Sequence, residues 1–153
     1  MCDDRGLHLH LDIAVAGGSN ARWVVEYAVD RRRRRNISKT GDVGALVFLD
    51  ADRLDEDRAA GRDPQTVPGR EHLKLVFLRP KLEGLLIRLH GGWERRFVAA
   101  QDAERQLKRL WPQYRKPMPA HALRERFGLD DLRRAAAHDR GLRDALTMLG
   151  LIP

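Results

Sequence analysis

The chain has 153 residues, of which 42% are apolar and 33% are charged, which is the size and composition of one folded domain. The single cysteine, Cys2, excludes an internal disulfide and a cysteine-based zinc site, and no apolar run is long enough to span a membrane. We therefore expect one domain over residues 1–153, in a reducing cytoplasm, without a secretion signal and without a membrane partner.

The net charge of +7 is concentrated in the second half of the chain. Residues 1–78 carry 13 basic and 13 acidic side chains, whereas residues 79–153 carry 16 basic and 9 acidic ones. A basic half beside acidic residues is typical of a protein that acts on a phosphate backbone. The alternative is a solvated arginine-rich surface of the kind that GC-rich genomes encode.

The first two expected elements are a strand over residues 7–16 and a helix over about 21–35. His8 and His10 share one face of the strand, and we expect an exposed face or edge there because no third metal ligand is near. Ser19 or Asn20 can cap the helix that follows. Its expected apolar stripe consists of Trp23, Val24, Tyr27 and Ala28. The five arginines at 31–35 are expected to be its solvated end.

The most apolar run, Gly44 to Asp50, is expected to be a strand buried on both faces of a parallel sheet. A strand, a helix and a second strand give adjacent parallel strands through a right-handed crossover. Ligands bind at the carboxyl ends of such strands, and Asp50 and Asp52 lie there on one side. Two close carboxylates predict a hard cation such as Mg²⁺ or Mn²⁺. The alternative is that the two aspartates only begin a solvated loop.

The rest of the chain is expected to be a polar loop over 53–70, a strand over 73–78, and helices. The loop can act as a flap over the two aspartates. The helices are expected at 81–90, 99–111, 119–127, 130–138 and 140–149. Leu82, Leu85, Leu86 and Leu89 are the expected core residues of the first of these helices. The large aromatic residues that follow are expected to pack rather than to stack on bases, and they are Trp93, Trp111 and Tyr114.

This order of motifs resembles the Toprim catalytic core, and within it the small Toprim-like proteins related to OLD-family and RloB-type bacterial defence nucleases. The resemblance depends on Asp50-Ala51-Asp52, on the segment Arg79 to His90 and on Pro112 to Pro117, and a closing helical stretch, 132–149, is also similar. It implies a Toprim-like, Rossmann-like α/β fold with a mainly parallel sheet flanked by helices. The α/β core would cover about 7–92 and the helical C-terminal part about 99–150.

The resemblance also implies a Mg²⁺-dependent nuclease of anti-phage defence, with Asp50, Asp52 and Glu83 as catalytic and metal-binding residues. The expected nucleic-acid contacts are Arg79, Lys81, Arg115 and Lys116. Toprim enzymes carry a glutamate at the end of the first strand, where this chain has Ala16. We therefore expect weak or no cleavage by the isolated chain.

Two other functions remain open at this stage. One is a non-catalytic subunit that binds DNA, RNA or a larger defence partner such as an ATPase. The other is phosphotransfer of the haloacid-dehalogenase kind, which is disfavoured because its Asp-x-Asp normally follows the first strand and has Thr or Val where this chain has Leu54.

Overall fold

The computed structural model describes residues 20–34 and 45–153, which form a mixed α/β fold. Within these residues there are seven α-helices and one parallel sheet of two strands. The expected strand at 7–16 lies outside the described residues, as do Cys2, His8 and His10. The glutamate-lacking position, Ala16, also lies outside them.

Helix α1, Ala21–Arg34, begins where the sequence predicts it. The side chain of Asn20 accepts a hydrogen bond from the Trp23 N–H (3.0 Å), which confirms the predicted cap. The predicted apolar stripe is partly wrong, because Val25 and Val29 are the buried residues of this helix. The Trp23 ring is 39% exposed and stacks on Tyr27. The helix is rotated so that its β-branched side chains, rather than its aromatic ones, contact the sheet.

Strands β1, Ala45–Asp50, and β2, Leu73–Leu78, pair in parallel, as predicted, with Asp50 opposite Leu78. The expectation that β1 is buried on both faces is wrong, because Phe48 is 47% exposed. Buried and exposed residues alternate from Val47 to Asp50. Helices α3 and α7 pack against β2, and they leave the Phe48 side of β1 open.

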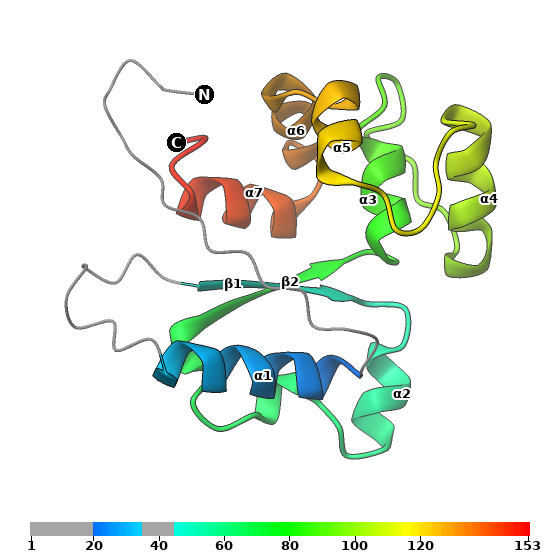
Figure 1. Ribbon diagram of the computed structural model, residues 1–153. Helices are drawn as coiled ribbons and strands as arrows, with labels where there is room; N and C mark the ends of the chain where they lie inside the picture. Colours follow the sequence, from blue (N-terminus) through cyan, green and yellow to red (C-terminus); the bar gives the residue numbers. More distant parts are fainter. Residues whose placement is uncertain (1–19, 35–44) are drawn as a thin grey trace.

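Two apolar clusters lie on the two faces of this sheet. On one face Val47, Leu49 and Leu73 pack with Val25 and Val29 of α1. On the other face β2 packs against the C-terminal helices, with a cluster formed mainly by Val76, Leu78, Ile87, Leu107, Trp111, Ala135, Leu142 and Leu146. Figure 1 shows α1 below the strands and the helices α3 to α7 above them. This layering sets the direction in which each strand residue points.

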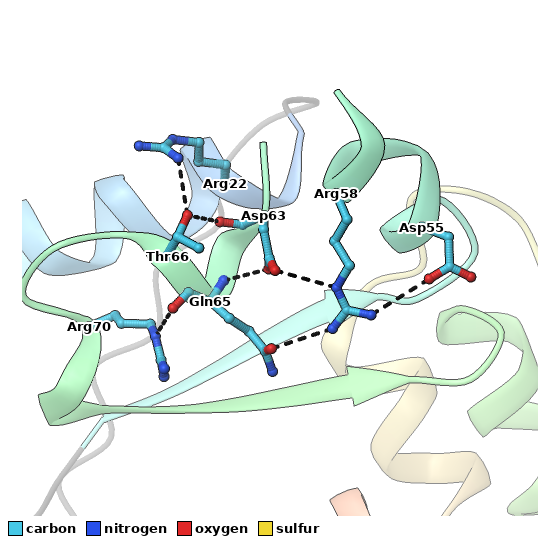
Figure 2. Close-up of polar contacts among 7 residues, drawn as sticks. All are labelled: Arg22, Asp55, Arg58, Asp63, Gln65, Thr66 and Arg70. Carbon is cyan, nitrogen blue, oxygen red and sulfur yellow. Dashed lines mark hydrogen bonds and ion pairs between the residues drawn. The ribbon is translucent and has the colours of Figure 1, made fainter. Parts of the chain in front are cut away.

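The predicted polar loop at 53–70 is largely structured, which corrects that expectation. It contains helix α2, Leu54–Ala59, and the 3-10 turns η2, Pro64–Thr66, and η3, Arg70–His72. Figure 2 shows Arg58 in contact with Asp55 (3.6 Å), Asp63 (3.4 Å) and Gln65 (3.4 Å). Arg22 of α1 reaches Thr66 in the same network (3.3 Å). Charged side chains therefore cross-link this segment internally, while Arg22 and the buried Val67 join it to α1.

The remaining helices agree with the prediction to within one or two residues at most ends. They are α3, Leu82–Arg88; α4, Ala100–Leu110; α5, Ala120–Arg126; α6, Leu129–Ala136; and α7, Arg140–Met148. Leu82 is not a core residue, since it is exposed at the first position of α3. Leu85, Leu86 and Leu89 are buried as predicted, and Trp111 and Tyr114 pack in the same cluster. None of the described helices has the length and apolar character needed to cross a membrane.

Candidate functional site

Asp50 lies at the carboxyl end of β1, where the chain leaves the sheet. Its Oδ1 accepts a hydrogen bond from the Leu82 N–H at the start of α3 (2.9 Å). The next backbone N–H, that of Ala51, donates to the carbonyls of Leu78 (3.0 Å) and Pro80 (2.9 Å). The segment 79–81 is therefore bound across the end of β1, and it places α3 directly beside the Asp50 carboxylate.

The electrostatic environment of Asp50 disfavours its negative charge. Partial burial is the largest cause, and it raises the pKa of the Asp50 carboxyl above its ordinary value, against the hydrogen bond from Leu82. Repulsion from Asp52 and Glu83 raises this pKa further, whereas Lys116 lowers it. A carboxylate with excess negative charge around it is a suitable ligand for an added cation.

Glu83, in the first turn of α3, is fully buried although it is charged. Its Oε1 accepts a hydrogen bond from the Tyr114 hydroxyl (3.0 Å) and forms an ion pair with the Lys116 ammonium. Its Oε2 is also buried and has no hydrogen-bond partner. Both partners come from the segment between α4 and α5, so Glu83 joins that segment to the start of α3.

These contacts determine the protonation of all three side chains. Burial opposes ionisation of Glu83, but hydrogen bonds from Lys116, its own backbone and Tyr114 outweigh it and hold the pKa of Glu83 below its usual value. The hydrogen bond to Glu83 raises the pKa of Lys116. Burial and the neighbouring Glu83 charge raise the pKa of Tyr114 well above its ordinary value. The buried group is thus a carboxylate bound by an ammonium and a neutral phenol.

We expect Tyr114→Phe to destabilise the fold by about 1.5 kcal/mol at neutral pH, because it removes one hydrogen bond to a buried carboxylate while Lys116 remains. The pKa of Glu83 is lower in the folded protein than in the unfolded chain, where it is ~4.3. The ionised Glu83 therefore stabilises the fold at a pH above the unfolded-state pKa, and this stabilisation is lost as the pH falls through the folded-state pKa. The measurement is the free energy of urea unfolding at neutral and at acidic pH. The difference between the variant and the native protein should shrink on acidification. Tyr27→Phe is the matched control, and equal losses in both variants at every pH would contradict the assignment.

The carboxylates suit a hard divalent cation in their chemistry, since Mg²⁺ takes oxygen ligands and keeps several waters. Asp50 and Asp52 can offer oxygens from the end of one strand, and Asp52 is exposed. Glu83 is close enough to repel Asp50, but its Oε1 is already engaged by Tyr114 and Lys116. Over residues 20–34 and 45–153 there is no group of three or more His, Cys, Asp or Glu side chains placed to hold a metal ion. Metal binding by Asp50, Asp52 and Glu83 therefore stays a prediction, and the pair Asp50 and Asp52 fits it better than the trio.

The four predicted nucleic-acid contacts occupy different places. Lys116 forms an ion pair with Glu83. Lys81 directly precedes α3, and its positive charge, like that of Lys116, favours the ionised form of Glu104 in α4. Arg79 is exposed in the segment that crosses the end of β1. Arg115 instead lines an open hollow of about 500 Å³ beside Trp111. The structure thus brings Lys116 into contact with the acidic cluster, whereas the other three contacts stay predictions.

Tyr114 is the site residue whose polar role the sequence analysis missed. It was expected to pack, and it does, but its hydroxyl also binds Glu83. The sequence carries no signal for this contact, because the residues after α4 form a turn and a bend rather than a strand, and the spacing of Tyr114 and Lys116 does not fix where their side chains point.

Comparison of the chain with protein-family models, with curated proteins and with solved structures gave no significant match. The class that the described residues define is a mixed α/β protein with an acidic group at the end of a parallel strand.

Proposed function

We propose that this protein is a Toprim-like, nuclease-type protein of bacterial defence that binds a nucleic-acid phosphate backbone and one Mg²⁺ ion beside Asp50 and Asp52. The observation that supports this proposal best is the Asp50 carboxylate. It lies at the carboxyl end of a parallel strand, where α/β proteins bind ligands, and its pKa is raised by burial and by neighbouring acids.

The charges around this edge support a phosphate ligand. Lys116 contacts the acidic group, and Lys81 and the exposed Arg79 belong to the segment that crosses the end of β1. A bound Mg²⁺ supplies Lewis-acid polarisation of a phosphoryl oxygen and lowers the pKa of a bound water. The protein itself would orient the phosphate with its ammonium groups and keep Asp50 in place through the Leu82 N–H.

A second function, binding without cleavage, is favoured by the state of Glu83. Its Oε1 is bound by Lys116 and Tyr114, its Oε2 is buried, and its pKa is held below the usual value, so this carboxylate is a poor general base. General acid/base assistance contributes roughly 10²–10⁴-fold to a rate. We therefore expect the isolated chain to bind nucleic acid and to cleave it weakly or not at all, and to act with a larger partner such as an ATPase.

The test compares the native chain with Asp50→Asn and Asp52→Asn in three assays: calorimetric binding of Mg²⁺ or Mn²⁺, nucleic-acid affinity with and without metal, and cleavage of DNA and RNA. We expect metal binding by the native chain and its loss in both variants. The native affinity for nucleic acid should fall steeply with salt, because neutralised phosphates release counterions. Because the pKa of Asp50 is raised, this carboxylate takes up a proton at a higher pH than an ordinary aspartate does. Metal binding should therefore weaken on acidification at a pH above the one at which an ordinary aspartate is protonated.

Asp55→Asn is the matched control, because it removes an exposed carboxylate five residues from Asp50. It should leave metal binding unchanged. Metal binding that survives in Asp50→Asn would exclude the proposed metal site. Rapid cleavage by the native chain, lost in both site variants, would establish an active nuclease and overturn the expectation of weak cleavage.

A further inference from the structure

The connection between α3 and α4 presents an exposed aromatic ring next to two arginines. Phe97 is 75% exposed, the most exposed of the large apolar side chains in the described part of the chain. Arg95 and Arg96, which precede it, are exposed as well. A single exposed apolar residue is common on protein surfaces, so the feature of interest is this ring together with the two arginines beside it.

The connection is held in a defined shape by its own contacts. The Arg96 N–H donates to the Trp93 carbonyl (2.9 Å), and the Arg96 guanidinium lies over the Trp93 ring at 5.2 Å. Trp93 packs against the C-terminal core. Glu94 accepts hydrogen bonds from the Gly92 N–H (3.1 Å) and from Arg134 of α6 (3.2 Å). The segment is therefore anchored on both sides, which lowers the entropy cost of binding a partner.

The charge of the connection is positive. Glu94 is neutralised by its ion pair with Arg134. In the part of the chain that the structure describes, no carboxylate pairs with Arg95 or Arg96. The connection thus offers two cations and one apolar ring to solvent.

We propose that residues 93–97 form a contact site for single-stranded nucleic acid, in which the Phe97 ring stacks on a base and Arg95 and Arg96 bind the neighbouring phosphates. This inference rests on the proposed function and adds the strand state of the partner. A stacking ring beside cations is the combination that single-strand binders use, because every base has an aromatic face and every nucleotide a phosphate. A base inside a duplex is covered by its neighbours and cannot stack on Phe97.

A membrane surface fits this segment less well. Interfacial binding normally needs an amphipathic helix that buries a continuous apolar face. Residues 93–99 are not helical, and they present one exposed ring. We therefore treat binding to anionic lipid as an outcome of the test.

The experiment measures fluorescence anisotropy of labelled oligothymidylate of about 20 nucleotides, of a duplex of the same length, and binding to phosphatidylserine vesicles. It is done in EDTA, so that a metal at Asp50 plays no part. Phe97→Ala should weaken oligothymidylate binding roughly 5- to 100-fold and leave duplex binding unchanged, whereas Phe97→Trp should retain affinity. Arg95→Gln should reduce the salt slope by about 0.7. Arg124→Gln is the charge control, because Arg124 is an exposed arginine of α5. This variant should keep the native ratio of oligothymidylate affinity to duplex affinity.

Each other outcome has a separate meaning. Native binding to oligothymidylate that is the same in Phe97→Ala overturns this inference and leaves the proposed function standing. A native chain that binds neither oligonucleotide in EDTA overturns this inference, and the affinity measured with Mg²⁺ then decides the proposed function separately. Vesicle binding that depends on Phe97, without an effect on oligothymidylate, overturns the inference in favour of a lipid surface. Native circular dichroism and an unchanged unfolding midpoint are expected for every variant, because all the replaced side chains are exposed.

Discussion

Replacing Arg88 with methionine is expected to lower the free energy of unfolding by about 3 kcal/mol, because it leaves a buried carboxylate without its cation. Arg88 is buried near the end of α3, and it contacts Asp139 (2.6 Å), which is also mostly buried. Its other donor binds the Arg79 carbonyl (2.6 Å). Methionine fills the aliphatic part of the space but satisfies neither acceptor. The expected loss lies at the lower end of the range for broken buried pairs, since Asp139 keeps the hydrogen bond from the Leu142 N–H (3.0 Å).

Urea unfolding monitored by tryptophan fluorescence checks this result, with Arg105→Met as the control. Arg105 forms an exposed ion pair with Asp102 within α4, and such pairs contribute between zero and about 1 kcal/mol. A loss in Arg88→Met no larger than that of the control would mean that the buried pair does not join α3 to α7. Partial restoration in Arg88→Lys would identify the charge, rather than the shape, as the main contribution.

Gly84→Ala is expected to cost about 3 kcal/mol, the upper end of the usual range for overpacking. A Cβ at this position would lie 2.5 Å from Cδ of Pro80 and 2.7 Å from the carbonyl oxygen of Arg79. One of these neighbours is backbone and the other is a proline ring, so neither can move away without shifting the segment 79–81. That shift would also move the Leu82 N–H from Asp50, so metal binding at the proposed site should weaken together with stability.

Gly91→Ala is the matched control for this substitution. Its nearest neighbour would be a guanidinium nitrogen of Arg134 at 3.9 Å, which is ordinary contact distance. The two variants are compared by urea unfolding and by calorimetric binding of Mg²⁺. A Gly84→Ala protein as stable as the control would show that α3 can move away from the segment 79–81 at little cost, and that close packing does not fix the position of Leu82.

The elements that the sequence predicted well are those with a strong periodic signal or a clear end. Strand β2 has the predicted bounds, Leu73–Leu78, and α4 ends immediately before Trp111 and Pro112. The error at α1 arises because apolar residues cover most of the helical wheel. Val24 and Ala28 lie between the aromatic residues on one side and Val25 and Val29 on the other, and periodicity alone cannot choose which side faces the sheet. The helix within 53–70 was missed because α2 is short, acidic and held mainly by ion pairs, which leave no apolar pattern.

The site was predictable where it depends on the end of a strand, and not where it depends on long-range contacts. The placement of Asp50 follows from the apolar run before it. The contact of Glu83 with Tyr114 and Lys116 spans about thirty residues, and it depends on how the segment after α4 returns to α3. The resemblance to Toprim proteins implies that Glu83 is a metal ligand, and the sequence could not show that Lys116 and Tyr114 occupy its Oε1 instead.

The pairing of Glu83 with Lys116 has a consequence for stoichiometry. Three carboxylates influence one another at this edge, and the ammonium of Lys116 cancels the charge of one of them. The two charges of Asp50 and Asp52 remain, and a single divalent ion balances them. A second divalent ion would leave these two carboxylates with an excess of two positive charges. Under the proposed function the protein therefore binds one metal ion at this edge. Paired-metal centres instead bind both the attacking and the leaving oxygen of an in-line displacement.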